Sequence, residues 1–118
     1  MPKRPRNFEV FVRERVREPV PYYSFFLDMV DGESVPAALV MSLIYDAYCQ
    51  RNGKDNVLYL EDDIAYRTGL PKEQCEDAIE IWERMGVLKV DKMSEEKAVY
   101  EVNLKLIFEF LVSGYFGR

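Results

Sequence analysis

Basic side chains that could contact phosphate groups gather in two parts of the sequence. Residues 1–18 carry six basic groups against three glutamates, a net charge of +3. Contacts of lysine and arginine with phosphates dominate nucleic-acid affinity. The candidate nucleic-acid-binding residues are therefore these six cations and four polar residues further along the chain: Lys3, Arg4, Arg6, Arg13, Arg15, Arg17, Arg67, Lys72, Gln74 and Lys92. The alternatives for the basic segment are a solvated tail, or a patch that pairs with an acidic surface of a partner.

Acidic side chains provide the opposite chemistry in the middle of the chain. The remaining hundred residues carry 10 basic and 18 acidic groups, and residues 61–85 alone have eight acidic groups against three basic ones. This segment has a net charge of −5, equal to that of the whole chain. Such a run is either a solvated helix face or a surface for a basic partner.

Catalytic chemistry has little support in this composition. The chain has no histidine, the commonest general base and metal ligand, and its two cysteines cannot complete a four-ligand zinc site. The six glycines are scattered, and the neighbouring carboxylates Asp62 and Asp63 would point in different directions on a helix. We therefore expect a protein that is not an enzyme, with no metal and no cofactor.

Size and apolar content predict one globular domain. The chain has 118 residues and a mass of 13.9 kDa, and 48% of its residues are apolar. No signal peptide is visible, and no apolar run is long enough to cross a bilayer. We expect a cytoplasmic protein that does not contact membranes, with Cys49 and Cys75 as free, buried thiols on helices.

The elements that would position these side chains can be located from the periodicity of apolar residues and from capping and turn residues. Ser34 is a suitable N-cap for a largely buried helix that ends at Asn52-Gly53. A short β-type run, 57–60, leads into a helix over 61–68, which Gly69 ends. A third helix runs from Pro71 to Gly86 with one apolar face. Two strands, 87–90 and 98–104, then flank a polar tip over 92–96.

One stretch carries a family resemblance. Residues 60–70, Leu-Glu-Asp-Asp-Ile-Ala-Tyr-Arg-Thr-Gly-Leu, are followed by a helix that ends in Trp-Glu-Arg-Met-Gly-Val-Leu. This pattern resembles the helix-turn-helix of winged-helix regulators and of phage and plasmid replication-initiator domains, and the likeness covers about residues 34–104. It implies a mostly α fold with a small antiparallel β-sheet: a winged helix-turn-helix with N- and C-terminal extensions.

The resemblance also implies how DNA would be contacted. In this superfamily the third helix enters the major groove and the wing touches phosphate or minor groove. The matching positions here are Pro71, Lys72, Glu73, Glu76, Asp77 and Glu80, of which Lys72 alone is cationic. The resemblance predicts a double-stranded DNA-binding protein of transcription regulation or replication, of phage, virus or plasmid type. The alternative is a protein–protein interaction module that uses the acidic third helix.

The predicted division of the chain has three parts. Residues 1–7 would form a flexible basic arm, residues 8–104 the winged-helix domain, and residues 105–118 an apolar C-terminal helix. An apolar helix beyond the wing must pack either on the first helix or on a second subunit. We expect a homodimer whose interface contains Leu106, Ile107, Phe110, Leu111 and Tyr115.

Overall fold

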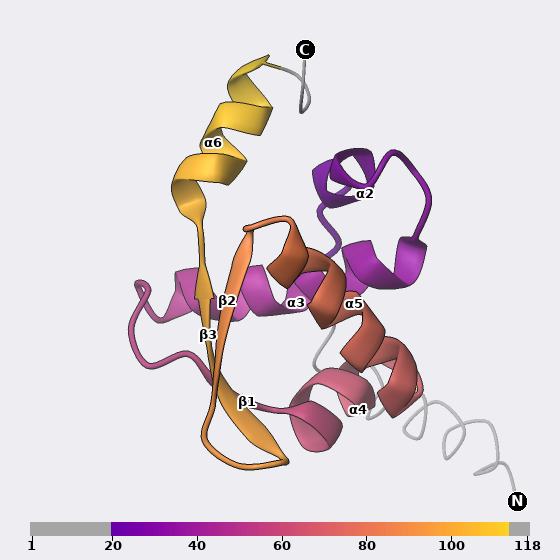
Figure 1. Ribbon diagram of the computed structural model, residues 1–118, viewed down its shortest axis with the longest axis vertical. Helices are drawn as coiled ribbons and strands as arrows, with labels where there is room; N and C mark the ends of the chain where they lie inside the picture. Colours follow the sequence, from indigo (N-terminus) through magenta and orange to yellow (C-terminus); the bar gives the residue numbers. More distant parts are fainter. Residues whose placement is uncertain (1–19, 114–118) are drawn as a thin grey trace, which may run out of the picture.

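The computed structural model describes residues 20–113, and its fold is the predicted winged helix with a small antiparallel sheet (Figure 1). The elements follow in the order α2 (Phe25–Met29), α3 (Val35–Gln50), β1 (Val57–Tyr59), η1 (Leu60–Ala65), α4 (Tyr66–Thr68), α5 (Lys72–Arg84), β2 (Leu88–Lys92), β3 (Lys97–Val102) and α6 (Leu104–Ser113). The predicted basic arm, 1–7, and residues 114–118 at the chain's end lie outside the described residues.

Helix α3 is the central, largely buried element, as predicted. It begins where the Ser34 hydroxyl accepts a hydrogen bond from the Ala37 N–H at 3.1 Å, and Pro36 occupies its first turn. The hydroxyl of buried Ser42 donates to the Ala38 carbonyl at 2.7 Å and accepts from the Tyr23 N–H at 3.0 Å. The chain just before α2 is thereby tied to the middle of α3.

The helix-turn-helix is formed by η1 with α4, a tight turn, and α5. The helix predicted over 61–68 is a π-helical turn, η1, followed by the short α4. The backbone N–H of Tyr59 donates to the Asp63 carboxylate at 2.7 Å, which satisfies a donor at the start of this turn. Gly69 has φ +75°, a left-handed conformation that favours glycine, so the chain reverses here as predicted.

The sheet has three antiparallel strands in the order β1-β3-β2. Leu88 is opposite Val102 in the β2–β3 hairpin, and Val57 is opposite Val99 where β1 joins the other edge of β3. Along β3, Ala98, Tyr100 and Val102 are buried, whereas Glu101 is exposed, which is the alternation of a strand with one face on the core.

The core joins α2, α3, α5 and one face of the sheet. Cys75, Ala78, Ile79 and Trp82 are the buried residues of α5, as its spacing predicted. The ring of Trp82 lies 5.5 Å from that of Phe26, edge to face, and its indole reaches α3, so Trp82 packs on α2 and α3.

Two predictions need correction. Cys75 is buried but Cys49 is exposed, because the last turn of α3 extends beyond the core and residues 49–51 all face solvent. The C-terminal helix begins at Leu104 rather than 105. Asn103 accounts for this start, since its side-chain oxygen accepts from the Leu106 N–H at 3.1 Å and so caps the helix.

Candidate functional site

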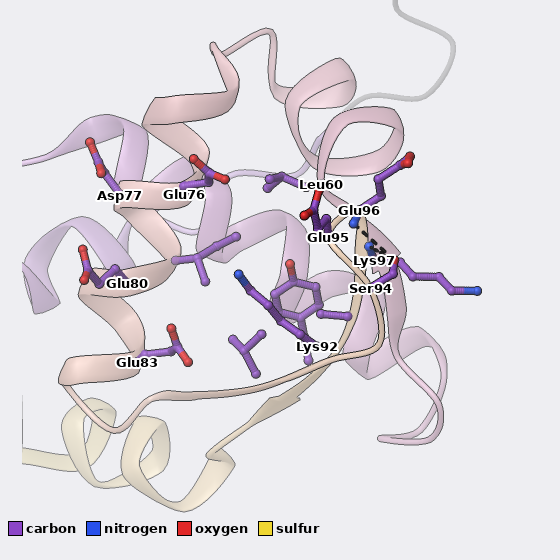
Figure 2. Close-up of a pocket in the computed structure, with 14 residues that line it drawn as sticks. Leu60, Glu76, Asp77, Glu80, Glu83, Lys92, Ser94, Glu95, Glu96 and Lys97 are labelled. Carbon is purple, nitrogen blue, oxygen red and sulfur yellow. Dashed lines mark hydrogen bonds between the residues drawn. The ribbon is translucent and has the colours of Figure 1, made fainter.

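A groove of about 570 Å³ lies between α5 and the wing (Figure 2). We call it the α5–wing groove. One wall comes from α5, the other from the β2–β3 hairpin. Its lining comprises Leu60, Glu76, Asp77, Ile79, Glu80, Glu83, Val90, Lys92, Ser94, Glu95, Glu96, Lys97, Ala98 and Tyr100.

The amphipathic pattern of α5 explains its wall. Residues Cys75, Ala78 and Trp82 turn inward and hold the helix on the core. Glu76, Glu80 and Glu83 are spaced by four and then three residues, so they follow one another along one side of the helix. In Figure 2 the carboxylates of Glu76 and Glu83 are directed toward the wing. Asp77 and Glu80 lie along the outer rim.

The hairpin tip provides the opposite wall. The Ser94 hydroxyl accepts from the N–H groups of Glu96, at 3.2 Å, and Lys97, at 3.3 Å. The Glu96 carbonyl accepts from the Leu60 N–H at 2.7 Å. These bonds hold the tip against the start of η1, and Figure 2 shows the Glu95 carboxylate directed into the groove.

The floor of the groove is apolar. It is formed by Leu60, Ile79, Val90, Ala98 and the ring of Tyr100. Tyr100 is buried, and burial, together with the nearby charge of Glu83, raises the pKa of its phenol to about 12. The phenol therefore stays neutral near pH 7, so it adds no charge to the floor.

The electrostatics of the groove are strongly negative. Six carboxylates and two lysines line it, a net charge of −4. Figure 2 shows the Lys92 amine directed back toward α5, whereas the Lys97 side chain runs away from the groove. The Lys97 amine lies 5.6 Å from the centroid of the Tyr59 ring. Lys92 is thus the cation that faces the groove's carboxylates. An apolar floor between acidic walls suits a ligand that alternates cationic and apolar groups.

The predicted nucleic-acid-binding residues are dispersed in the described structure. Lys92 lines the groove. Lys72 and Gln74 are exposed in the first turn of α5, and Arg67 is half-buried on α4; none of these three lines the groove. The remaining six lie outside the described residues: Lys3, Arg4, Arg6, Arg13, Arg15 and Arg17.

The residues predicted for a dimer interface separate into different environments. Ile107 and Phe110 are buried in the core, each with 3% of its surface exposed. Leu106 is half-buried against that core, Leu111 is exposed, and Tyr115 lies outside the described residues. The apolar side chains of α6 that face solvent are Leu104, Phe108, Leu111 and Val112.

Sequence reasoning missed three acidic residues of the groove. Glu83 could have been found, because it continues the spacing of Glu76 and Glu80. Glu95 and Glu96 fall in the polar tip predicted over residues 92–96, whose mixed charges do not indicate a groove. Their approach to α5 depends on the hairpin's bend, and no local pattern predicts that bend.

Metal-binding clusters and membrane-spanning helices are absent from residues 20–113. No group of three or more histidine, cysteine, aspartate or glutamate side chains there could hold a metal ion. No helix in this range combines the length and apolar character required to cross a membrane. Comparisons with protein-family models, with curated proteins and with solved structures found no match.

Proposed function

We propose that this chain is a winged-helix protein-interaction module whose α5–wing groove binds a basic segment of a partner protein. The single observation that carries the proposal is the net charge of −4 over an apolar floor in this groove. Cations of a partner would meet Glu76, Glu83 and Glu95, while its apolar side chains would cover the floor. Such charge complementarity steers encounter and fixes orientation.

The same charge disfavours duplex DNA in this groove. A carboxylate and a phosphate in contact repel by about 1 kcal/mol in water. Several carboxylates along the α5 wall would face the phosphates of a major groove, and Lys92 offsets one of them. The winged-helix fold itself does not decide the ligand, because function depends on the site and not on the scaffold.

Fluorescence anisotropy tests this proposal. The probe is a fluorescein-labelled peptide in which lysine and leucine alternate, and a peptide with glutamate in place of lysine is the negative control. We expect saturable binding that weakens as salt is raised. Added salt shortens the Debye length, to about 8 Å at 0.15 M, and so screens the attraction between the charges.

Matched charge variants locate the binding. Replacing Glu76, Glu83 and Glu95 by glutamine should lower the affinity for the lysine–leucine peptide by about tenfold or more, since each exposed ion pair contributes up to about 1 kcal/mol. Asp28→Asn, Glu33→Gln and Glu101→Gln together remove the same charge at exposed positions outside the groove and should have little effect. Equal weakening by the two triple variants would contradict the proposal.

A second candidate function is DNA binding in transcription regulation or replication. It is favoured by the charge asymmetry of the chain, +3 in residues 1–18 against −8 in the rest. In this alternative the basic segment contacts phosphates and Lys92 on the wing assists it. We expect micromolar affinity for duplex DNA at low salt. Replacing Lys3, Arg4 and Arg6 by glutamine should reduce the slope of log K against log salt by about 0.9 for each phosphate that the variant no longer neutralises.

The two candidates predict opposite responses to one variant. If the groove binds a basic partner, neutralising Glu76, Glu83 and Glu95 weakens binding of the lysine–leucine peptide. If residues 1–18 bind phosphates, the same change leaves the affinity for duplex DNA unaffected or slightly increased. Absence of any duplex binding at 50 mM salt would eliminate the DNA candidate.

The proposal includes a homodimer. Apolar side chains of α6 are exposed, and a symmetric pair of chains would present two acidic grooves. Binding of two basic segments on one partner would then gain from effective concentration.

A further inference from the structure

Helix α6 carries two apolar faces, and one of them faces solvent. Leu104, Phe108, Leu111 and Val112 are 48%, 64%, 53% and 69% exposed. Phe108, Leu111 and Val112 follow Leu104 by four, seven and eight residues, which places all four on one side of the helix. We call them the outer stripe. Four large apolar side chains that face water together on one helix mark an interaction surface.

The outer stripe is separate from the face that α6 uses to fold. Ile107 and Phe110 point into the core and are 3% exposed. The start of the helix is fixed through Asn103, whose side-chain N–H donates to the Gly86 carbonyl at 3.2 Å and whose backbone N–H donates to the Val87 carbonyl at 2.8 Å. The stripe is therefore presented on an anchored helix.

The place of α6 leaves the groove accessible. Figure 1 shows α6 continuing from β3 at the end opposite the hairpin tip. None of the groove-lining residues belongs to α6. A partner on the outer stripe and a partner in the groove would thus use different parts of the molecule.

We infer that the outer stripe packs against the outer stripe of a second copy of this chain, with the two α6 helices antiparallel about a two-fold axis. The charges beside the stripe select this occupant. Lys105 and Glu109 are exposed, and they lie along the same edge of the stripe, four residues apart. An antiparallel two-fold pair brings this edge of one helix beside the same edge of the other with its direction reversed.

In that arrangement the charges complement one another twice. Lys105 of one protomer lies near Glu109 of its partner, and symmetry repeats the contact. A parallel two-fold pair would set the charged edge against the opposite edge of the stripe, where Ile107 is already buried in the core. The self-complementary pattern therefore favours a second copy and the antiparallel direction.

The interface is small. A helix of ten residues is about 15 Å long. A standard interface buries about 800 Å² on each partner, which is more than one face of such a helix supplies. We therefore expect a dimer that forms at micromolar concentration, held mainly by the four apolar side chains, with the charged edge setting its direction.

This inference rests on the homodimer of the proposed function and not on the groove. Light scattering and sedimentation equilibrium on the full chain over 1–200 µM test it. We expect a concentration-dependent rise from the chain's 13.9 kDa toward twice that mass. Phe108→Asp should keep the protein monomeric, raising the dissociation constant more than about 100-fold through burial of an unpaired charge. Tyr66→Asp, at a position 71% exposed on α4, is the matched control and should dimerise normally.

Charge reversal tests the direction of the helices. Lys105→Glu should raise the dissociation constant about tenfold, because it creates two like-charge contacts. Adding Glu109→Lys to that variant should restore the original value. Far-UV circular dichroism checks that each variant is folded, and Val112→Asp, at a site 69% exposed, replaces Phe108→Asp if the latter is unfolded.

Each outcome separates one claim. The monomer mass at every concentration overturns both the homodimer and this interface. A dimer that tolerates Phe108→Asp and Val112→Asp overturns the interface and leaves the homodimer standing. A dimer that Phe108→Asp disrupts but the charge-reversed pair fails to rescue overturns the antiparallel arrangement. Binding of the lysine–leucine peptide by Phe108→Asp reports on the groove alone.

Discussion

Trp82 and Ala37 are joined by a hydrogen bond through the core. The indole N–H of Trp82, fully buried on α5, donates to the Ala37 carbonyl in the first turn of α3 at 2.8 Å. The bond joins the helix that forms one wall of the groove to the central helix. The position of Glu76 and Glu83 relative to the wing therefore depends on this contact.

Trp82→Phe should lower the free energy of unfolding by about 2–4 kcal/mol. The change removes the second hydrogen bond to the Ala37 carbonyl, worth about 0.5–1.5 kcal/mol, and leaves a cavity where the larger ring packed against Phe26. Urea denaturation followed by far-UV circular dichroism measures the loss. A loss below about 0.5 kcal/mol would show that this contact does not hold α5 on α3.

Gly69→Ala should lower the free energy of unfolding by about 1–2 kcal/mol. No atom lies within 4 Å of an added Cβ, so the cost comes from the left-handed backbone at φ +75° rather than from a clash. Gly69→Asn is the matched control, since asparagine tolerates this conformation better and should cost less. Thermal unfolding compares the two, and an equal loss for both would contradict the conformational explanation.

Stability should fall at alkaline pH because of Tyr100. Its phenol has a pKa raised to about 12 in the folded protein, against 10.0 as its ordinary value. The contribution of this phenol to the free energy of unfolding is fully present below pH 10. It declines as pH rises from 10 to 12, because the phenol loses its proton at lower pH in the unfolded chain than in the folded one. The loss should approach about 2 kcal/mol.

Tyr100→Phe is the control for this pH dependence. It removes the phenol whose pKa is raised in the folded protein, so the unfolding free energy of the variant should decline less steeply above pH 10. Urea denaturation at a series of pH values provides the comparison. Identical slopes for the two proteins would show that the phenol of Tyr100 ionises as readily in the folded chain as in the unfolded one.

Features encoded by single residues could be predicted from the sequence. Ser34 marks the start of α3, Gly69 marks the turn, and the spacing from Cys75 to Trp82 marks the buried face of α5. Each depends on local backbone chemistry or on helical periodicity. Together with the order of the elements and the motif over residues 60–70, these features predicted a winged helix.

Features that depend on distant contacts could not be predicted. The pairing of β1 with β3 joins Val57 to Val99, and a three-residue run carries no signal for its partner. The apolar residues of α6 cover so much of the helix that periodicity could not show which of them face the core. The α5–wing groove combines residues from α5 and the hairpin tip, and their proximity is a property of the folded chain.

Chemical-shift mapping of the full chain shows directly whether the α5–wing groove binds a basic segment. A ¹H–¹⁵N spectrum is titrated with the lysine–leucine peptide and, separately, with duplex DNA. We expect the peptide to shift backbone signals on both walls of the α5–wing groove, at Glu76, Glu83 and Glu95, and to leave the signals of residues 31–34 unmoved. Peptide-induced shifts that avoid the groove, or duplex-induced shifts along α5 and the wing, would contradict the proposed function.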